Sequence, residues 1–115
     1  MSGPITTHVL DTACGRPAAG VAVTLERASP DGAWAELARG ATDADGRLRD
    51  WLPADFALTP GDYRLRFATG DYHRSQGLAP FYPEVVVHVR IDQPGGHYHL
   101  PILLNPFGYS TYRGS

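Results

Sequence analysis

Residues 97–104 read His-Tyr-His-Leu-Pro-Ile-Leu-Leu, and this stretch decides the fold. Successive side chains of a β-strand point to opposite faces. One face of this segment is uniformly large and apolar, and it consists of Tyr98, Leu100, Ile102 and Leu104. The other face carries His97, His99, Pro101 and Leu103. We therefore predict a strand that buries its even-numbered side and turns its two histidines away from the core.

Short runs with the same two-residue period recur along the chain, separated by turns rich in Gly, Pro and Asp. The predicted strands are residues 5–11, 20–28, 33–41, 47–49, 62–69, 85–91, 97–104 and 109–113. Residues 72–79 lack the alternation and are expected to hold a single short helix before Pro80. Eight short strands with one helix predict an all-β sandwich of two sheets, formed by residues 1–115 as a single domain.

Composition excludes several classes of function. The formal net charge is −2 and no basic block is present, so we expect no nucleic-acid partner. The N-terminus lacks the pattern of a signal peptide and no apolar run could span a bilayer, which predicts a cytoplasmic protein without membrane association. All ten basic residues are Arg, which excludes lysine Schiff-base chemistry. Cys14 is the only cysteine, so an intrachain disulfide and a multi-cysteine zinc site are excluded.

The histidine-bearing faces are the candidate functional surface. On the first strand Val9 is expected to point inward, which turns His8 and Leu10 outward. A face that mixes histidines with Leu10 and Leu103 is unusual for a solvated sheet and suggests that something packs on it. We interpret this face as a buried site at a subunit interface, with ordinary surface histidines as the alternative.

A metal site is a second interpretation of the same histidines. His97 and His99 project from one side of a strand, as the ligands of some zinc sites do, and His8 would have to be the third ligand. No His-Glu-x-x-His motif or carboxylate cluster accompanies them, and we predict no metal. Asp43 and Asp45 are assigned to a tight turn.

Three segments together resemble the transthyretin-like hydrolases. They are residues 7–12 (Thr-His-Val-Leu-Asp-Thr) with Gly-Arg-Pro-Ala at 15–18, residues 42–48 (Thr-Asp-Ala-Asp-Gly-Arg-Leu), and the C-terminal residues 97–101 and 110–115. The final Tyr-Arg-Gly-Ser is the most specific of these, because it resembles the signature that separates the hydrolases from the hormone carriers of the same fold. At His8, Arg47, His99 and Tyr112 this chain has the hydrolase residue type.

The resemblance implies a transthyretin-like sandwich of two four-stranded sheets with one short helix. It also implies a homotetramer built as a dimer of dimers, with active sites in the central channel. The implied reaction converts 5-hydroxyisourate to 2-oxo-4-hydroxy-4-carboxy-5-ureidoimidazoline in urate breakdown, without a cofactor. A non-catalytic carrier of small ligands with the same fold, and a His-x-His metal-binding module, are the alternatives.

The expected site residues follow from the resemblance and from the chemistry of ring opening. The catalytic set is His8, Arg47 and His99, and the substrate-binding set is His8, Arg47, Tyr112, Ser110 and Ser115. His8 or His99 is expected to be the general base, because a neutral imidazole titrates near working pH. The guanidinium of Arg47 is expected to hold the developing oxyanion. Tyr112 offers an aromatic wall and a hydroxyl group.

Overall fold

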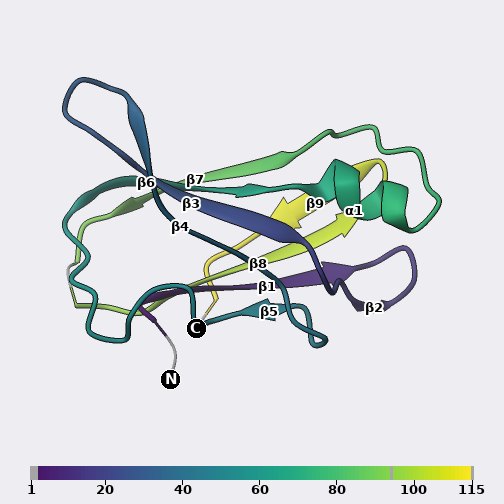
Figure 1. Cartoon of the computed structure of the whole chain (residues 1–115), viewed down its shortest axis with the longest axis horizontal. Helices are drawn as coiled ribbons and strands as arrows, with labels where there is room; N and C mark the ends of the chain where they lie inside the picture. Colours follow the sequence, from purple (N-terminus) through teal and green to yellow (C-terminus); the bar gives the residue numbers. More distant parts are fainter. Residues whose placement is uncertain (1–2, 94, 115) are drawn as a thin grey trace.

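The computed structural model describes residues 3–93 and 95–114, and it contains two β-sheets and one short helix (Figure 1). The first sheet consists of β1 (Ile5–Asp11), β2 (Arg16–Pro17), β5 (Arg47–Leu48), β8 (Tyr98–Asn105) and β9 (Gly108–Thr111). The second consists of β3 (Ala22–Ala28), β4 (Trp34–Ala41), β6 (Gly61–Phe67) and β7 (Val85–Ile91). The helix α1 (Thr69–Ser75) follows β6.

The first sheet joins strands from opposite ends of the chain. Its order is β2-β1-β8-β9, and β5 also pairs with β1. The pairing of β1 with β8 is parallel, whereas the other pairs of both sheets are antiparallel. The second sheet has the order β4-β3-β6-β7. The parallel pairing matters for function, because it places the His8 segment beside the His99 segment.

The core lies between the two sheets, on the faces that alternation predicted. Val9, Leu100, Ile102 and Leu104 line it from the first sheet, and Val23, Leu25, Leu65, Phe67 and Val85 line it from the second. Each of these side chains is at most 5% exposed. Full burial of such an apolar side chain stabilises the fold by about 1.5–3 kcal/mol. The predicted direction of the strand over residues 97–104 is therefore confirmed.

The predicted sandwich of two sheets is confirmed, with one strand more than expected. The extra strand lies between the predicted strands 5–11 and 20–28, where Arg16 and Pro17 pair with Asp11 and Leu10 of β1. The first sheet therefore has five strands instead of four. A two-residue strand is too short to show alternation, which is why the pattern missed it.

The helix begins earlier than predicted, at Thr69 instead of residue 72. Gly70 lies under the backbone of Pro83, where its amide donates to the Pro83 carbonyl at 3.1 Å and a Cβ would lie 2.6 Å from that oxygen. Tyr72 ties the helix to the first sheet through a 2.7 Å hydrogen bond to Asp11. These tertiary contacts set the start of α1. Within the described ranges no helix is long and apolar enough to cross a membrane.

Candidate functional site

The turn before β5 positions Arg47. Oδ1 of Asp43 accepts hydrogen bonds from the amides of Asp45 (2.9 Å) and Arg47 (3.0 Å). These two bonds hold residues 43–47 in a tight turn. These amides, with the hydrogen bond to the Arg47 amide as the leading cause, hold the pKa of Asp43 below its usual range. Gly46 has φ +75° and lies so close to the Val9 carbonyl that a Cβ would clash with it. The predicted turn is confirmed.

His8 is oriented by the same turn. It stands directly opposite Arg47 in the β1–β5 register, so both side chains project from the outward face of the sheet. Nε2 of His8 lies 2.9 Å from the carbonyl oxygen of Asp45. A carbonyl can only accept, so Nε2 carries a proton and donates it to this bond. In a neutral His8 ring Nδ1 is therefore the bare nitrogen.

His99 lies on β8, two register positions from Pro101, the residue that stands opposite His8. Its cross-strand neighbour on β1 is Thr6, whose hydroxyl oxygen lies 2.8 Å from His99 Nδ1. Burial lowers the pKa of His99, and the charges of Arg47, His8 and His97 lower it further. His99 is therefore held as a neutral imidazole near neutral pH. Its Nε2 atom makes no hydrogen bond within the described residues and is left for a ligand.

The C-terminal tail covers His99. Gly114 pairs with His99, and its amide donates to the His99 carbonyl at 2.8 Å. A Cβ on Gly114 would lie 2.6 Å from Cδ2 of the His99 ring, so only a glycine lets the tail approach this closely. The register that pairs Ile102 with Thr111 and His99 with Gly114 places Tyr112 opposite Pro101. Tyr112 therefore belongs to the row Arg47, His8, Pro101, Tyr112 across the sheet.

The two serines of the predicted substrate-binding set are placed differently. Ser110 pairs with Leu103, so it shares the outward face but lies about 13 Å from His99 along the strand. Ser115 lies outside the described residues. The structure thus brings together Arg47, His8, His99 and Tyr112, while the roles of both serines stay predictions.

The remaining histidines lie in three different places. His97 is exposed, and its Nε2 lies 3.3 Å from the Thr6 hydroxyl. His73 is buried in α1. His88 lies on the second sheet, 2.9 Å from a carboxylate oxygen of Asp62. Sequence analysis missed Thr6, although it shares the outward parity of His8 and could have been found there.

The described residues contain no group of three or more His, Cys, Asp or Glu side chains that could hold a metal ion. The imidazoles of His8 and His99 and the guanidinium of Arg47 lie on one face of the first sheet. No ion pair joins Arg47 to a carboxylate within residues 3–93 and 95–114. Such a set can abstract a proton and stabilise an oxyanion. These are the kinds of groups that hydrolysis of a small polar ligand would use.

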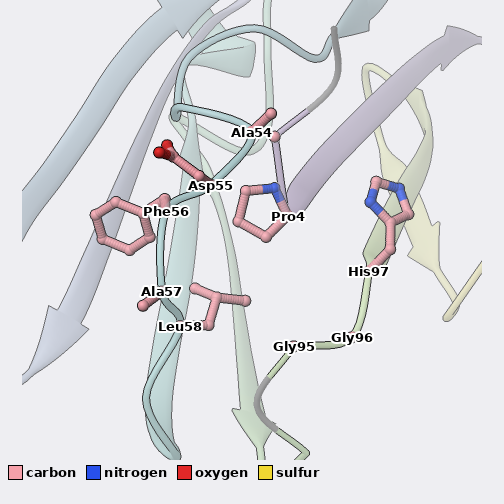
Figure 2. Close-up of a pocket in the computed structure, with 10 residues that line it drawn as sticks. Pro4, Ala54, Asp55, Phe56, Ala57, Leu58, Gly95, Gly96 and His97 are labelled. Atoms are coloured by element: carbon pink, nitrogen blue, oxygen red, sulfur yellow. The ribbon is translucent and has the colours of Figure 1, made fainter.

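Two hollows flank these residues. One, of about 470 Å³, has His97 on one wall and Ala54, Asp55 and Phe56 on the other, with Pro4 between them (Figure 2). The second, of about 220 Å³, lies on the outward face and is lined mainly by apolar atoms of Leu10, Pro17 and Leu103, with Arg16 at its edge. Along the strands, the row of site residues at Pro101 lies between His97 and Leu103, which line the two hollows.

This chain belongs to the HIUase/Transthyretin family, whose model matches residues 5–114. A 5-hydroxyisourate hydrolase of Salmonella typhi is 46% identical over 114 residues, which are 99% of this chain and 82% of that protein. Transthyretin from Sparus aurata has a TM-score of 0.90 at 35% identity, with 96% of both chains covered. The 5-hydroxyisourate hydrolase of Klebsiella pneumoniae has a TM-score of 0.85 at 35% identity, covering 98% of this chain and 99% of that one. The fold is common to both kinds of protein, so the site residues must distinguish them.

Proposed function

We propose that this chain is an enzyme that hydrolyses 5-hydroxyisourate in urate breakdown. The observation that carries the proposal is the meeting of Arg47, His8 and His99 on adjacent strands of one outward face. The name of the Salmonella typhi relative, 5-hydroxyisourate hydrolase, supports it. A carrier would need shape complementarity but no base, and a neutral imidazole beside the Arg47 guanidinium is better suited to catalysis than to ligand storage.

The reaction opens a cyclic amide. Water adds to a ring carbonyl carbon, the bond from that carbon to the ring nitrogen breaks, and the nitrogen leaves with a proton. In this proposal Nε2 of His99 takes a proton from the attacking water, because its lowered pKa keeps it neutral. General base catalysis of this kind contributes roughly 10²–10⁴-fold in rate. The leaving nitrogen receives a proton in return, so the site ends as it began.

Arg47 acts on the oxygen side of the substrate, and His8 accepts a hydrogen bond from a substrate donor group. The guanidinium of Arg47 is permanently charged and presents a planar fork of donors to the carbonyl that becomes an oxyanion. His8 is oriented by the carbonyl of Asp45 and turns bare Nδ1 toward a substrate donor. Tyr112 forms an aromatic wall at the other end of the row. Ser110 and Ser115 contribute further hydrogen bonds, and no cofactor takes part.

We further propose that the active protein is a homotetramer, a dimer of dimers, with the outward face of the first sheet covered by another subunit. The apolar hollow lined by Leu10, Pro17 and Leu103 supports this, because exposing an apolar surface to water is unfavourable and such surfaces mark sites of subunit contact. Sedimentation velocity is expected to give four times the 12.5 kDa chain mass. A variant Leu103→Asp is expected to dissociate the assembly and lose activity, and a fully active monomer would contradict the arrangement.

The expected compartment is the cytoplasm. The single cysteine, Cys14, is exposed and free, which suits a reducing environment. Cell fractionation followed by immunodetection tests this placement.

One assay separates the proposed enzyme from its alternatives. Freshly generated 5-hydroxyisourate is followed by absorbance with the protein, with the protein after chelator treatment, and with buffer alone. We expect fast decay that the chelator does not change. Binding without accelerated decay would identify a carrier, and loss of activity with chelator would identify a metal-dependent protein.

A further inference from the structure

One buried hydroxyl group joins the proposed base to a second histidine. Thr6 is 3% exposed although it lies on the outward side of β1. Its Oγ1 atom lies 2.8 Å from Nδ1 of His99 and 3.3 Å from Nε2 of His97. The three side chains therefore form a continuous chain of hydrogen-bonding atoms, His99–Thr6–His97.

A threonine hydroxyl has one proton, so it donates to one ring nitrogen and accepts from the other. Two arrangements are available. In the first, Nδ1–H of His99 donates to Thr6 and the hydroxyl donates to His97, which leaves Nε2 of His99 bare. In the second, every bond is reversed and Nε2 of His99 carries the proton. The direction of the two hydrogen bonds at Thr6 thus decides whether Nε2 of His99 is bare and can act as a base.

The electrostatic surroundings favour moving a positive charge away from His99. The ring is partly buried, which disfavours its imidazolium form, and the permanent charge of Arg47 on β5 disfavours that form further. Of the described tail residues, Gly114 contacts the His99 ring and the Arg113 guanidinium lies 4.7 Å from the ring centroid of Tyr98, so neither brings a negative charge to His99.

His97, by contrast, is exposed and forms one wall of the 470 Å³ hollow, across which lies Asp55 (Figure 2). A proton on His97 can be solvated and screened, whereas a proton on His99 is partly buried beside the Arg47 guanidinium. The described geometry therefore provides both a reason for the charge to leave His99 and a connected route for it.

We propose that Thr6 is a positioning residue that sets the tautomer of His99 and passes the abstracted proton to His97. Nε2 of His99 takes a proton from water, and the resulting hydroxide forms the bond to the substrate carbonyl carbon. The Nδ1 proton of His99 moves to Thr6 as the hydroxyl proton of Thr6 moves to Nε2 of His97. His99 ends neutral with its proton on Nε2, and His97 holds the charge.

The reverse transfer completes the cycle. Nε2–H of His99 gives its proton to the leaving ring nitrogen, Thr6 returns a proton to Nδ1, and His97 returns its proton to Thr6. No proton is gained or lost by the chain of groups over the cycle. This inference rests on the proposed hydrolase function, but the hydrogen-bonding chain can also be measured without substrate.

The first experiment replaces the hydroxyl while keeping the shape. Thr6→Val is expected to lower kcat by about 10–100-fold with little change in KM, because it removes part of the acid–base contribution and no substrate contact. Thr6→Ser is expected to recover most of this loss. Thr7→Val is the matched control, since Thr7 is buried on the same strand and its hydroxyl donates to the Leu100 carbonyl, not to a histidine. It is expected to lower thermal stability and leave the pH profile of kcat unchanged.

The second experiment separates proton transfer from packing. His97→Ala is expected to lower kcat by about tenfold, and added imidazole buffer is expected to restore much of it by accepting the proton from Thr6. The proposed proton transfer through Thr6, called the relay below, would be overturned by either of two results. One is that imidazole does not restore the kcat of His97→Ala, and the other is a wild-type kcat in Thr6→Val.

A readout without substrate keeps the relay distinct from the proposed function. Nitrogen-detected NMR of the imidazoles is expected to show the proton of His99 on Nδ1 in the wild-type protein and a mixture of tautomers in Thr6→Val. An unchanged tautomer in Thr6→Val would refute the positioning role even if the enzyme hydrolyses 5-hydroxyisourate. The expected tautomer change in a protein that does not hydrolyse 5-hydroxyisourate would uphold the positioning role of Thr6 and refute the substrate assignment alone.

Discussion

The outward faces of the two sheets differ in whether their cationic side chains are paired with carboxylates. Among the described residues of the second sheet most cations have a carboxylate partner, and the exception is Arg27, whose guanidinium lies 5.9 Å from the centroid of the Tyr63 ring. The pairs are Arg64–Glu26 (2.5 Å), Arg66–Glu84 (3.1 Å), His88–Asp62 (2.9 Å) and Arg90–Asp62 (2.8 Å). Hydrogen bonds from Arg90 and His88 lower the pKa of Asp62 to about 2.

On the first sheet the cationic and titratable groups gather without such partners. Within the described residues Arg47 has no carboxylate within ion-pair distance, and His8 and His99 are bonded to a backbone carbonyl and a hydroxyl. Burial lowers the pKa of His99, and the neighbouring charge of Arg47 lowers it further. The outward face of the second sheet, the paired face, therefore pairs its charges within the chain. The outward face of the first sheet, the unpaired face, leaves Arg47 and the two imidazoles available to an electron-rich ligand.

The largest expected effect is the loss of activity when a site residue on the unpaired face is replaced. Replacing Arg47, His8 or His99 by Ala is expected to lower kcat/KM by about 10²–10⁴-fold, because each removes oxyanion stabilisation or acid–base catalysis. The decay of 5-hydroxyisourate measures this. His88→Ala is the matched control, since it removes an imidazole from the paired face, and its kcat/KM should stay within about threefold of wild type. If the His88 variant lost as much as the His99 variant, the distinction between the two faces would be wrong.

The tail is expected to give the next largest effect. Gly114→Ala is expected to lower kcat by tens of fold, because the new Cβ would lie 2.6 Å from Cδ2 of His99 and displace the ring. Deletion of residues 112–115 is expected to abolish most turnover while the melting temperature changes little, as short terminal segments contribute little to stability. Calorimetry and the decay assay measure the two quantities. A fully active deletion variant would show that Tyr112 lies outside the site.

A smaller effect on stability, and none on catalysis, is expected from the paired face. Glu26→Gln removes the carboxylate that Arg64 contacts at 2.5 Å, in a side chain that is only 12% exposed. We expect a loss of about 1–3 kcal/mol in the free energy of unfolding, because a half-buried guanidinium is left without its partner. Urea denaturation measures it. A drop in kcat with unchanged stability would mean that this face also serves the reaction.

The smallest effect concerns the titration of His99. Because its pKa is lowered, kcat/KM should fall with acidification only below the ordinary histidine value of about 6.5. Arg47→Gln removes one of the positive charges that disfavour the imidazolium, so the pKa of His99 should rise. Proton NMR of the ring carbons follows this without an activity measurement. A fall or no change in the pKa of His99 in this variant would contradict the assigned electrostatics.

Much of the site could be predicted because β-strand alternation is local. The apolar parity of residues 98, 100, 102 and 104 placed His99 outward, and Val9 placed His8 outward in the same way. The helix boundary was less accurate. Its start depends on the contact of Gly70 with Pro83, thirteen residues away, which no local pattern contains.

The sequence by itself determined which side of each strand is buried, because the two-residue period of side chains follows from the backbone alone. It also determined the Asp43 turn, since the carboxylate bonds to amides only two and four residues away. Only the tertiary structure decided that β1 lies parallel to β8, which brings Thr6 to His99 across 93 positions of the chain. The register between distant strands depends on how all the apolar faces fit into one core, and that fit is a property of the whole fold.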